Sequence, residues 1–304
     1  MLSRSICFAA AFTFGVATVA GAQVTAIADI QATNFANDSN PGDVFPILTG
    51  DFTNTAGMTV SATGQFSFDG FDSGYADQTM TLTGSSRAWA VYQSLKAEAS
   101  ATVDNAFYNP DNTPYYDGEN DVVNEDGMPD YLAVNGQASF SEKLLSGGTA
   151  TAYTSTYLLN LSGSIVGDGE AFVFIELQHG FENPETYFYN VSGDYSIPIV
   201  SQTYVTGGGG ERFSMRMLAS FQADLANYND NTDLAGSADF FNTFDFVAIE
   251  ARDADTGELL PAGSITGETS GATYTIGIAA VPEPGTAVAL GSSLSLLLLR
   301  RRTK

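Results

Sequence analysis

Histidine, cysteine and basic side chains are scarce in this 304-residue sequence. Eleven Lys and Arg accompany 35 Asp and Glu, for a formal net charge of −24, and there is one histidine and one cysteine. Nucleic-acid binding depends on basic side chains that displace counterions from phosphates, so the charge balance excludes it. A zinc site needs a set of His and Cys ligands that this composition does not supply.

Charged residues make up only 15% of the chain, and Asn, Ser, Thr and Gly provide the remaining polarity. This composition is more typical of β-rich extracellular proteins than of helical cytosolic ones. The ligands that an acidic surface attracts are calcium, cationic groups and water.

The first 22 residues predict a signal peptide. Arg4 supplies a positive start, residues 6–20 are apolar, and Ala20-Gly21-Ala22 is a small-residue cleavage site, so the mature chain is expected to begin at Gln23. Removal of residues 1–22 takes away Cys7, leaving neither a disulfide nor a thiol. A packed core must then stabilise the mature protein.

The C-terminal segment 281–304 has three unlike parts in sequence. Pro282-Glu283-Pro284 cannot continue a strand or enter a helix interior, so the folded domain is expected to end there. Residues 285–299 are uncharged and apolar, a short segment compared with the roughly 20 residues of a full membrane span. Basic residues at 300–304 would stay in the cytosol under the positive-inside rule, so the segment predicts a short transmembrane helix.

This order of parts resembles the PEP-CTERM sorting signal of Gram-negative bacteria. The residues that carry the resemblance are Pro282, Glu283, Pro284, Arg300, Arg301 and Arg302. It implies an exported protein with transient inner-membrane anchoring, whose tail is recognised and cut by exosortase, a membrane transpeptidase, in cells that make exopolysaccharide. The alternatives are an ordinary C-terminal membrane anchor and a buried apolar helix followed by basic residues.

The region between the two targeting segments, 23–280, predicts a single antiparallel β-sandwich domain. Segments such as 58–68 and 78–84 alternate apolar and small polar residues with a period of two, which is typical of half-buried strands. The most apolar segments, 153–163 and 171–177, should lie in the core, joined by a turn at 166–169. Segments 92–101, 138–142, 238–243, 255–257 and 270–274 resemble domains of PEP-CTERM proteins, which implies a jelly-roll-like sandwich.

An acidic insertion at 104–130 is the candidate for metal binding. It contains eight carboxylates and no basic residue, and Asn124-Glu-Asp-Gly-Met-Pro-Asp130 partly resembles a calcium loop. Val122 occupies the place of the first acidic ligand. The tentative calcium ligands are therefore Asn124, Asp126, Asp130 and Asp121, and the alternative is a solvated acidic loop.

Aromatic residues flank this insertion and suggest a carbohydrate ligand. Exposed rings cover the apolar face of a sugar while Asp and Asn bind its hydroxyl groups, and Tyr115 and Tyr116 are the candidates. The sequence contains 14 Tyr and 21 Phe, most of which must fill strands and sandwich corners.

Catalytic motifs are lacking. His179 follows an apolar segment without a recognisable nucleophile motif, which favours a structural role over general-base chemistry. Four glycines at 207–210 lack the Lys-Ser/Thr of a phosphate-binding loop. A glycosidase needs only two carboxylates, and Glu176 would share a strand face with Phe172 and Phe174.

These features together predict an exported cell-surface or exopolysaccharide-matrix protein without catalytic activity. Its expected partners are exosortase and extracellular polysaccharide or cell-surface components. Two alternatives stay open: a calcium-assisted carbohydrate-binding module and a secreted glycoside-acting enzyme.

Overall fold

The computed structural model describes the β-rich part of the chain between Gln23 and Tyr274. The described ranges are 23–33, 47–69, 79–106, 115–116, 122–123, 131–146, 152–167, 170–180, 182–207, 210–225, 232–261 and 263–274. The predicted signal peptide and the predicted C-terminal sorting signal lie outside them. None of the described residues belongs to a helix long and apolar enough to cross a membrane.

The described residues form 16 β-strands and no α-helix. Sheet A has the order β11-β10-β13-β8-β1-β2, and β15 joins it through β8 and carries β16. Its strands are β1 (Gln23–Thr33), β2 (Ile47–Thr53), β8 (Tyr131–Ser146), β10 (Ala171–His179), β11 (Glu185–Tyr189), β13 (Glu211–Asp224), β15 (Ile265–Gly267) and β16 (Thr273–Tyr274).

Sheet B has the order β12-β9-β14-β5-β4-β3. Its strands are β3 (Thr59–Asp69), β4 (Thr79–Val91), β5 (Ser94–Ala106), β9 (Ala152–Val166), β12 (Gly193–Gly207) and β14 (Thr232–Asp253). A separate two-stranded hairpin pairs β6 (Tyr115–Tyr116) with β7 (Val122–Val123). Neighbouring strands pair antiparallel in both sheets, so the predicted all-β, antiparallel class is confirmed.

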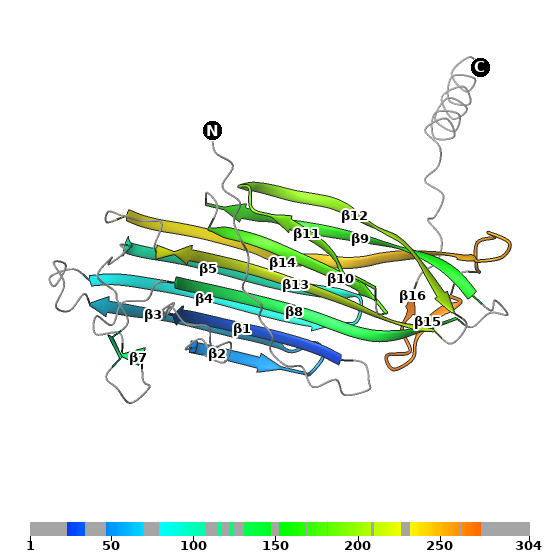
Figure 1. Cartoon of the computed structure of the whole chain (residues 1–304), viewed down its shortest axis with the longest axis horizontal. Coiled ribbons are helices and arrows are strands. Elements are labelled where there is room, and N and C mark those ends of the chain that lie inside the picture. The colour runs from blue at the N-terminus through cyan, green and yellow to red at the C-terminus, as the bar shows by residue number, and fades with distance from the viewer. Residues whose placement is uncertain are drawn as a thin grey trace, which may run out of the picture.

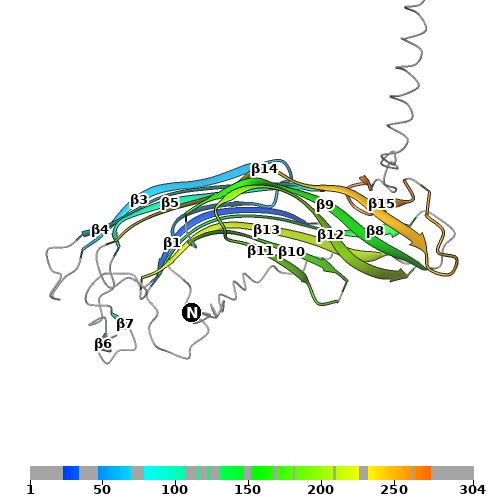
Figure 2. The same ribbon diagram turned by 90° about the horizontal axis from the view of Figure 1, so that it is seen from above.

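The two sheets pack face to face along their length (Figure 1). Seen from above, both layers are arched, with β3, β5 and β14 on the convex side and β1, β13 and β10 on the concave side (Figure 2). Each sheet therefore has an inner face that contacts its partner and an outer face that points away from it.

The alternating pattern of β4 shows how the sequence determines these faces. Its even-numbered side chains from Met80 to Ala90 are buried between the sheets, whereas the odd-numbered ones, including Arg87 and Trp89, point outward. Period-two alternation places successive side chains on opposite faces of a strand. The predicted strands at 58–68 and 78–84 correspond to β3 and the first half of β4.

The apolar segments 153–163 and 171–177 form β9 and β10, and both contribute to the core as predicted. Their connection differs from a hairpin, because β9 belongs to sheet B and β10 to sheet A. Local turn signals at 166–169 end a strand but do not specify which strand the next one will join, since that choice depends on long-range pairing.

Two groups of buried side chains fill the space between the sheets. The first is rich in aromatic rings and includes Phe140, Tyr157, Phe213, Phe240 and Phe244. The second consists of smaller side chains such as Ile30, Leu82, Val103 and Val134, with several alanines. Within the first group, the rings of Tyr157 and Phe213 stack with their centroids 4.2 Å apart.

Candidate functional site

Six side chains gather on the outer face of sheet B and form what we call the outer-face cluster. They are Arg87 and Trp89 of β4, Lys96 and Glu98 of β5, and Asp239 and Phe241 of β14. The cluster combines two aromatic rings, two cations and two carboxylates on three adjacent strands.

Strand pairing explains how four of these residues meet. β4 and β5 pair in an unbroken antiparallel register that places Arg87 opposite Glu98 and Trp89 opposite Lys96. Directly opposite residues on one face of an antiparallel pair have their Cβ atoms about 5 Å apart, within reach of long side chains. The alternation of both strands directs all four side chains outward.

The third strand contributes through a β-bulge. The register of β14 shifts between Phe240 and Phe244, which are opposite Ala97 and Leu95 of β5, so β14 contains two extra residues there. Phe240 and Phe244 are both fully buried, whereas Phe241 between them is partly exposed. Bulges of this kind re-aim side chains and are common beside functional sites.

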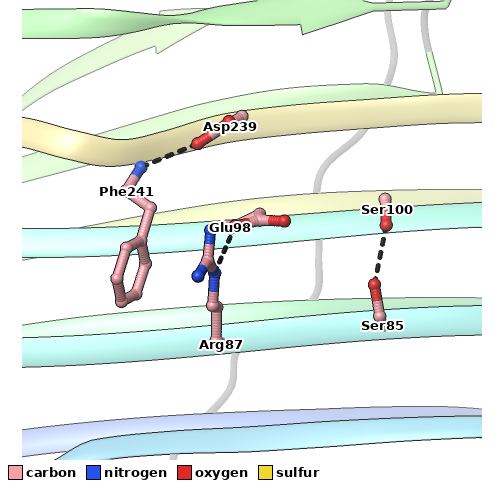
Figure 3. Close-up of polar contacts among 6 residues, drawn as sticks. All are labelled: Ser85, Arg87, Glu98, Ser100, Asp239 and Phe241. Carbon is pink, nitrogen blue, oxygen red and sulfur yellow. Dashed lines mark hydrogen bonds and ion pairs between the residues drawn. The ribbon is translucent and has the colours of Figure 1, made fainter.

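The side chain of Asp239 stabilises the bulge. Its Oδ1 atom accepts a hydrogen bond from the backbone N–H of Phe241 at 3.0 Å, a local turn typical of Asp. Figure 3 shows the ring of Phe241 projecting from β14 to one side of Arg87, which reaches from β4 toward Glu98 on β5. The bulge therefore places an aromatic ring beside the charged side chains of β4 and β5.

Two glycines permit the close packing beneath the cluster. A Cβ atom on Gly163 of β9 would lie 2.4 Å from the carbonyl oxygen of Asp239, at the base of the bulge. A Cβ atom on Gly136 of β8 would lie 2.5 Å from the carbonyl oxygen of Glu98 and 2.6 Å from that of Arg87. The backbone that carries the cluster is therefore packed closely against β9 in the same sheet and against β8 in the other sheet.

Charge and aromatic contacts hold the cluster together. The Nε atom of Arg87 donates to Oε2 of Glu98 at 2.5 Å, and its guanidinium carbon lies 4.0 Å from the centre of the Phe241 ring. Lys96 Nζ lies 4.8 Å from the centre of the Trp89 ring and 5.9 Å from that of Phe241. Such exposed contacts are each worth only about 0.5–1 kcal/mol.

The surroundings of the cluster are rich in hydroxyl groups. Ser85 and Ser100 form a hydrogen bond at 2.9 Å in the next cross-strand row (Figure 3). On the other side, Ser94 donates from Oγ to Oδ1 of Asp245 at 2.6 Å. Aromatic rings beside carboxylates and hydroxyls are suited to a sugar, whose apolar face stacks on a ring while its hydroxyls bind polar groups.

His179 lies in the interior, away from this face. It is 2% exposed, its Nδ1 atom lies 2.8 Å from the Tyr157 hydroxyl, and its Nε2 atom lies 2.9 Å from Oγ1 of Thr206. Burial lowers the pKa of His179 to about 4, so the ring is neutral at pH 7. Both of its nitrogens join β10 of sheet A to strands of sheet B.

A second buried polar group surrounds Glu142 of β8. Oε1 of this fully buried carboxylate accepts the backbone N–H groups of Thr269, at 3.2 Å, and Ser270, at 2.6 Å. Its Oε2 accepts the hydroxyls of Ser270, at 2.8 Å, and Tyr274, at 2.7 Å. Burial, followed by the proximity of Glu142, raises the pKa of the Tyr274 hydroxyl. Glu142 therefore holds the turn between β15 and β16.

Among the residues that the sequence singles out, the structure describes Glu176 in full and only the backbone of Tyr115 and Tyr116. Tyr115 and Tyr116 form β6, and the structure describes their backbone pairing with β7 but not their side chains. Glu176 lies half-buried on the outer face of sheet A, on the same face as Phe172 and Phe174.

The four tentative calcium ligands, Asn124, Asp126, Asp130 and Asp121, lie outside the described residues, as do the sorting-motif residues. In the described ranges, no group of three or more His, Cys, Asp or Glu side chains is placed to hold a metal ion. Calcium binding stays a prediction. A calcium-dependent rise in melting temperature that is lost in Asp126→Ala would support it, and no rise would refute it.

Comparison with known proteins finds no family model that matches this chain and no related curated protein. Only the geometry of the outer-face cluster therefore marks it as a candidate site. One signal in the sequence pointed to it: Trp89, the single tryptophan, occupies a position of β4 that alternates with buried alanines and so faces outward.

Proposed function

We propose that this chain is an exported cell-surface or exopolysaccharide-matrix protein without catalytic activity that holds polysaccharide on the outer face of sheet B. In this proposal the signal peptide at 1–22 is removed, the domain 23–280 is a jelly-roll-like sandwich, and the C-terminal helix anchors the chain until exosortase cuts near Pro282–Pro284. The acidic, hydroxyl-rich composition supports an extracellular site of action.

The outer-face cluster is the observation that carries the polysaccharide part of the proposal. Trp89 and Phe241 are half-buried rings that contact Lys96 and Arg87, so part of their side-chain freedom is already restricted before a sugar stacks on them. Glu98 and Asp239 offer carboxylate oxygens next to these rings. A rigid sheet positions a binding site more accurately than a loop does.

Binding to the producer's own polysaccharide tests this proposal. We expect purified protein to be retarded in affinity electrophoresis through gels that contain this polysaccharide, and Trp89→Ala and Phe241→Ala to weaken binding by roughly tenfold or more, as for aromatic anchors of interfaces. Phe52→Ala is the matched control, because Phe52 is an exposed aromatic residue on sheet A. Equal retardation of all variants, or none for the wild type, would refute glycan binding at this face.

The export part of the proposal is tested by intact mass. Protein recovered from its native cells should begin at Gln23 and end near Pro282–Pro284 in the extracellular fraction. A chain that keeps residues 296–304 and occurs only in the membrane fraction would indicate a plain anchor instead of a sorting signal.

A further inference from the structure

Apart from the short β16 beside β15, the strand orders of the two sheets end in four edge strands among the described residues, two in each sheet. Sheet A ends in β11 and β2, and sheet B ends in β12 and β3. An edge strand presents unpaired backbone N–H and C=O groups that can pair with another chain, and proteins generally block such edges.

Three of the four edges carry blocking features. β12 contains Pro198 and a bulge after Val200, and the backbone N–H of Gln202 donates to Oε1 of Glu185 on β11 at 2.9 Å instead of to a neighbouring strand. In β2, the N–H of Phe52 donates to Oδ1 of its neighbour Asp51 at 2.8 Å. β11 has only five residues. Short length, proline, bulges and local carboxylates are recognised means of protecting edges.

β3 carries none of these blocking features. It has 11 residues and pairs with β4 in continuous register from Thr59 to Asp69 without a bulge. It contains no proline, and its only charged residue is Asp69 at its end. In the part of the chain that the structure describes, no side chain bonds to a backbone amide of β3.

The strand is also locally ordered. The ring of Phe66 lies over Gly64, where an added Cβ atom would be only 2.5 Å from the ring, an arrangement in which an aromatic residue covers a glycine in an edge strand. Val60 and Ala62 are buried on the inner face, and Ser61 and Thr63 are exposed on the outer face. β3 is therefore a continuous edge without a bulge, and residues 59–68 of it carry no charge.

We propose that β3 pairs with β3 of a second copy of this chain, antiparallel and about a two-fold axis at Gly64. A second copy fits this edge because the side chains of β3 are matched about Gly64: Ser61 would lie opposite Ser67 of the partner copy, and the small Ala62 opposite Phe66. Residues 59–68 carry no charge, so two acidic chains can approach there without opposing like charges. In this register Thr63 faces Gln65 of the partner copy, and inner-face residues stay on the inner face. Such an isologous contact closes after two subunits.

Pairing would join the two six-stranded sheets into one continuous sheet. The two outer-face clusters would then lie on the same face of it, because antiparallel pairing in this register preserves the outward direction of odd-numbered residues. This last step rests on the proposed function: a dimer would present two polysaccharide sites and gain avidity on one polymer or link two polymers.

Sedimentation of the purified full chain tests the pairing. We expect a monomer–dimer equilibrium that shifts toward dimer as salt rises, because salt screens the repulsion between two acidic chains. The double substitution Thr63→Asp with Gln65→Asp should give only monomer, since it places four new carboxylates at the two-fold axis. Thr81→Asp with Thr83→Asp is the matched control, because it adds the same charge to the same face one strand inward. A wild-type monomer at all salt concentrations would overturn the proposal.

Cross-linking provides a second test that does not depend on the acidic variant folding. Thr63→Cys with Gln65→Cys should form a covalent dimer on mild oxidation, because directly opposite Cβ atoms lie within reach of a disulfide. The same substitutions at Thr81 and Thr83 should not. Absence of the cross-link would overturn the pairing. A monomeric protein that still binds polysaccharide would overturn this inference and leave the proposed function standing.

Discussion

The Glu142 network and the outer-face cluster use the same kinds of side chain for opposite purposes. Glu142 is fully buried, and both of its oxygens are occupied by donors from the turn between β15 and β16. Glu98 has a side chain that is 23% exposed, and its recorded contact is the ion pair with Arg87. The first carboxylate has its bonding capacity filled by its own chain, whereas the second keeps part of its capacity open to a ligand.

This difference indicates which group to regard as structural. A buried carboxylate is tolerated only when donors compensate for its lost hydration, so its partners are required for folding. An exposed cluster contributes little to stability and is free to serve binding. Stability and binding measurements should therefore separate the two regions.

The largest effect on stability is expected from Glu142→Ala. The substitution leaves two backbone N–H groups and two hydroxyls without their acceptor, and we expect the free energy of unfolding to fall by about 3–5 kcal/mol. Urea unfolding measures this loss. Polysaccharide binding by the folded fraction should be unchanged, and a loss below about 1 kcal/mol would contradict the structural role.

A smaller, pH-dependent effect is expected from His179. Its pKa is about 4 in the folded protein and about 6.5 when unfolded, so the unfolded chain binds more protons between these values. The stabilisation is complete above pH 6.5 and is lost as the pH falls toward 4, by roughly 2–3 kcal/mol at pH 4. The difference in unfolding free energy between wild type and His179→Gln, followed from pH 7 to pH 4, isolates this contribution from that of the carboxylates. A difference that is constant with pH would contradict it.

Gly163→Ala should affect both stability and binding, because Gly163 packs against the backbone of β14 at the bulge that carries part of the exposed cluster. The added methyl group would meet the Asp239 carbonyl and the Phe240 ring, so we expect a loss of about 1–3 kcal/mol. Displacement of the bulge should also weaken polysaccharide binding. Gly207→Ala is a suitable control, since an added Cβ there has nothing within 4 Å. Unchanged binding by Gly163→Ala would show that the bulge does not position the site.

The smallest effect on stability is expected from Arg87→Ala. It removes a solvent-exposed ion pair and one cation–aromatic contact, and should cost less than about 1 kcal/mol. Because Phe241 would lose the guanidinium that orients its ring, we still expect weaker polysaccharide binding. Thermal unfolding and affinity electrophoresis of the same sample would measure stability and binding. A small loss of stability together with weaker binding, the reverse of the result expected for Glu142→Ala, would confirm that the two regions serve different roles.

The strand pattern was readable from sequence because it depends on local alternation. The turn at 253–257 is likewise local, with Oδ1 of Asp253 accepting the N–H groups of Asp255 and Thr256 at 2.9 and 2.8 Å. Those bonds lower the pKa of the Asp253 carboxyl. Turns of this type need only neighbouring residues, so composition and order suffice to predict them.

The candidate site was not predictable in the same way. The sequence points to Tyr115 and Tyr116 because they lie in an acidic segment, but proximity in sequence says little about a surface built from three strands. Phe241 meets Arg87 only because β14 lies beside β5 and carries a bulge there. Two buried phenylalanines, Phe240 and Phe244, create that bulge by both facing the core.

The sequence by itself determined the acidic charge and the all-β character, because composition and period-two patterns act locally. Only the tertiary structure decided which sheet each strand joins, where Glu142 and His179 find their partners, and which edge is left unblocked. These features depend on contacts between residues far apart in the chain, whose pairing follows from the packing of the whole sandwich.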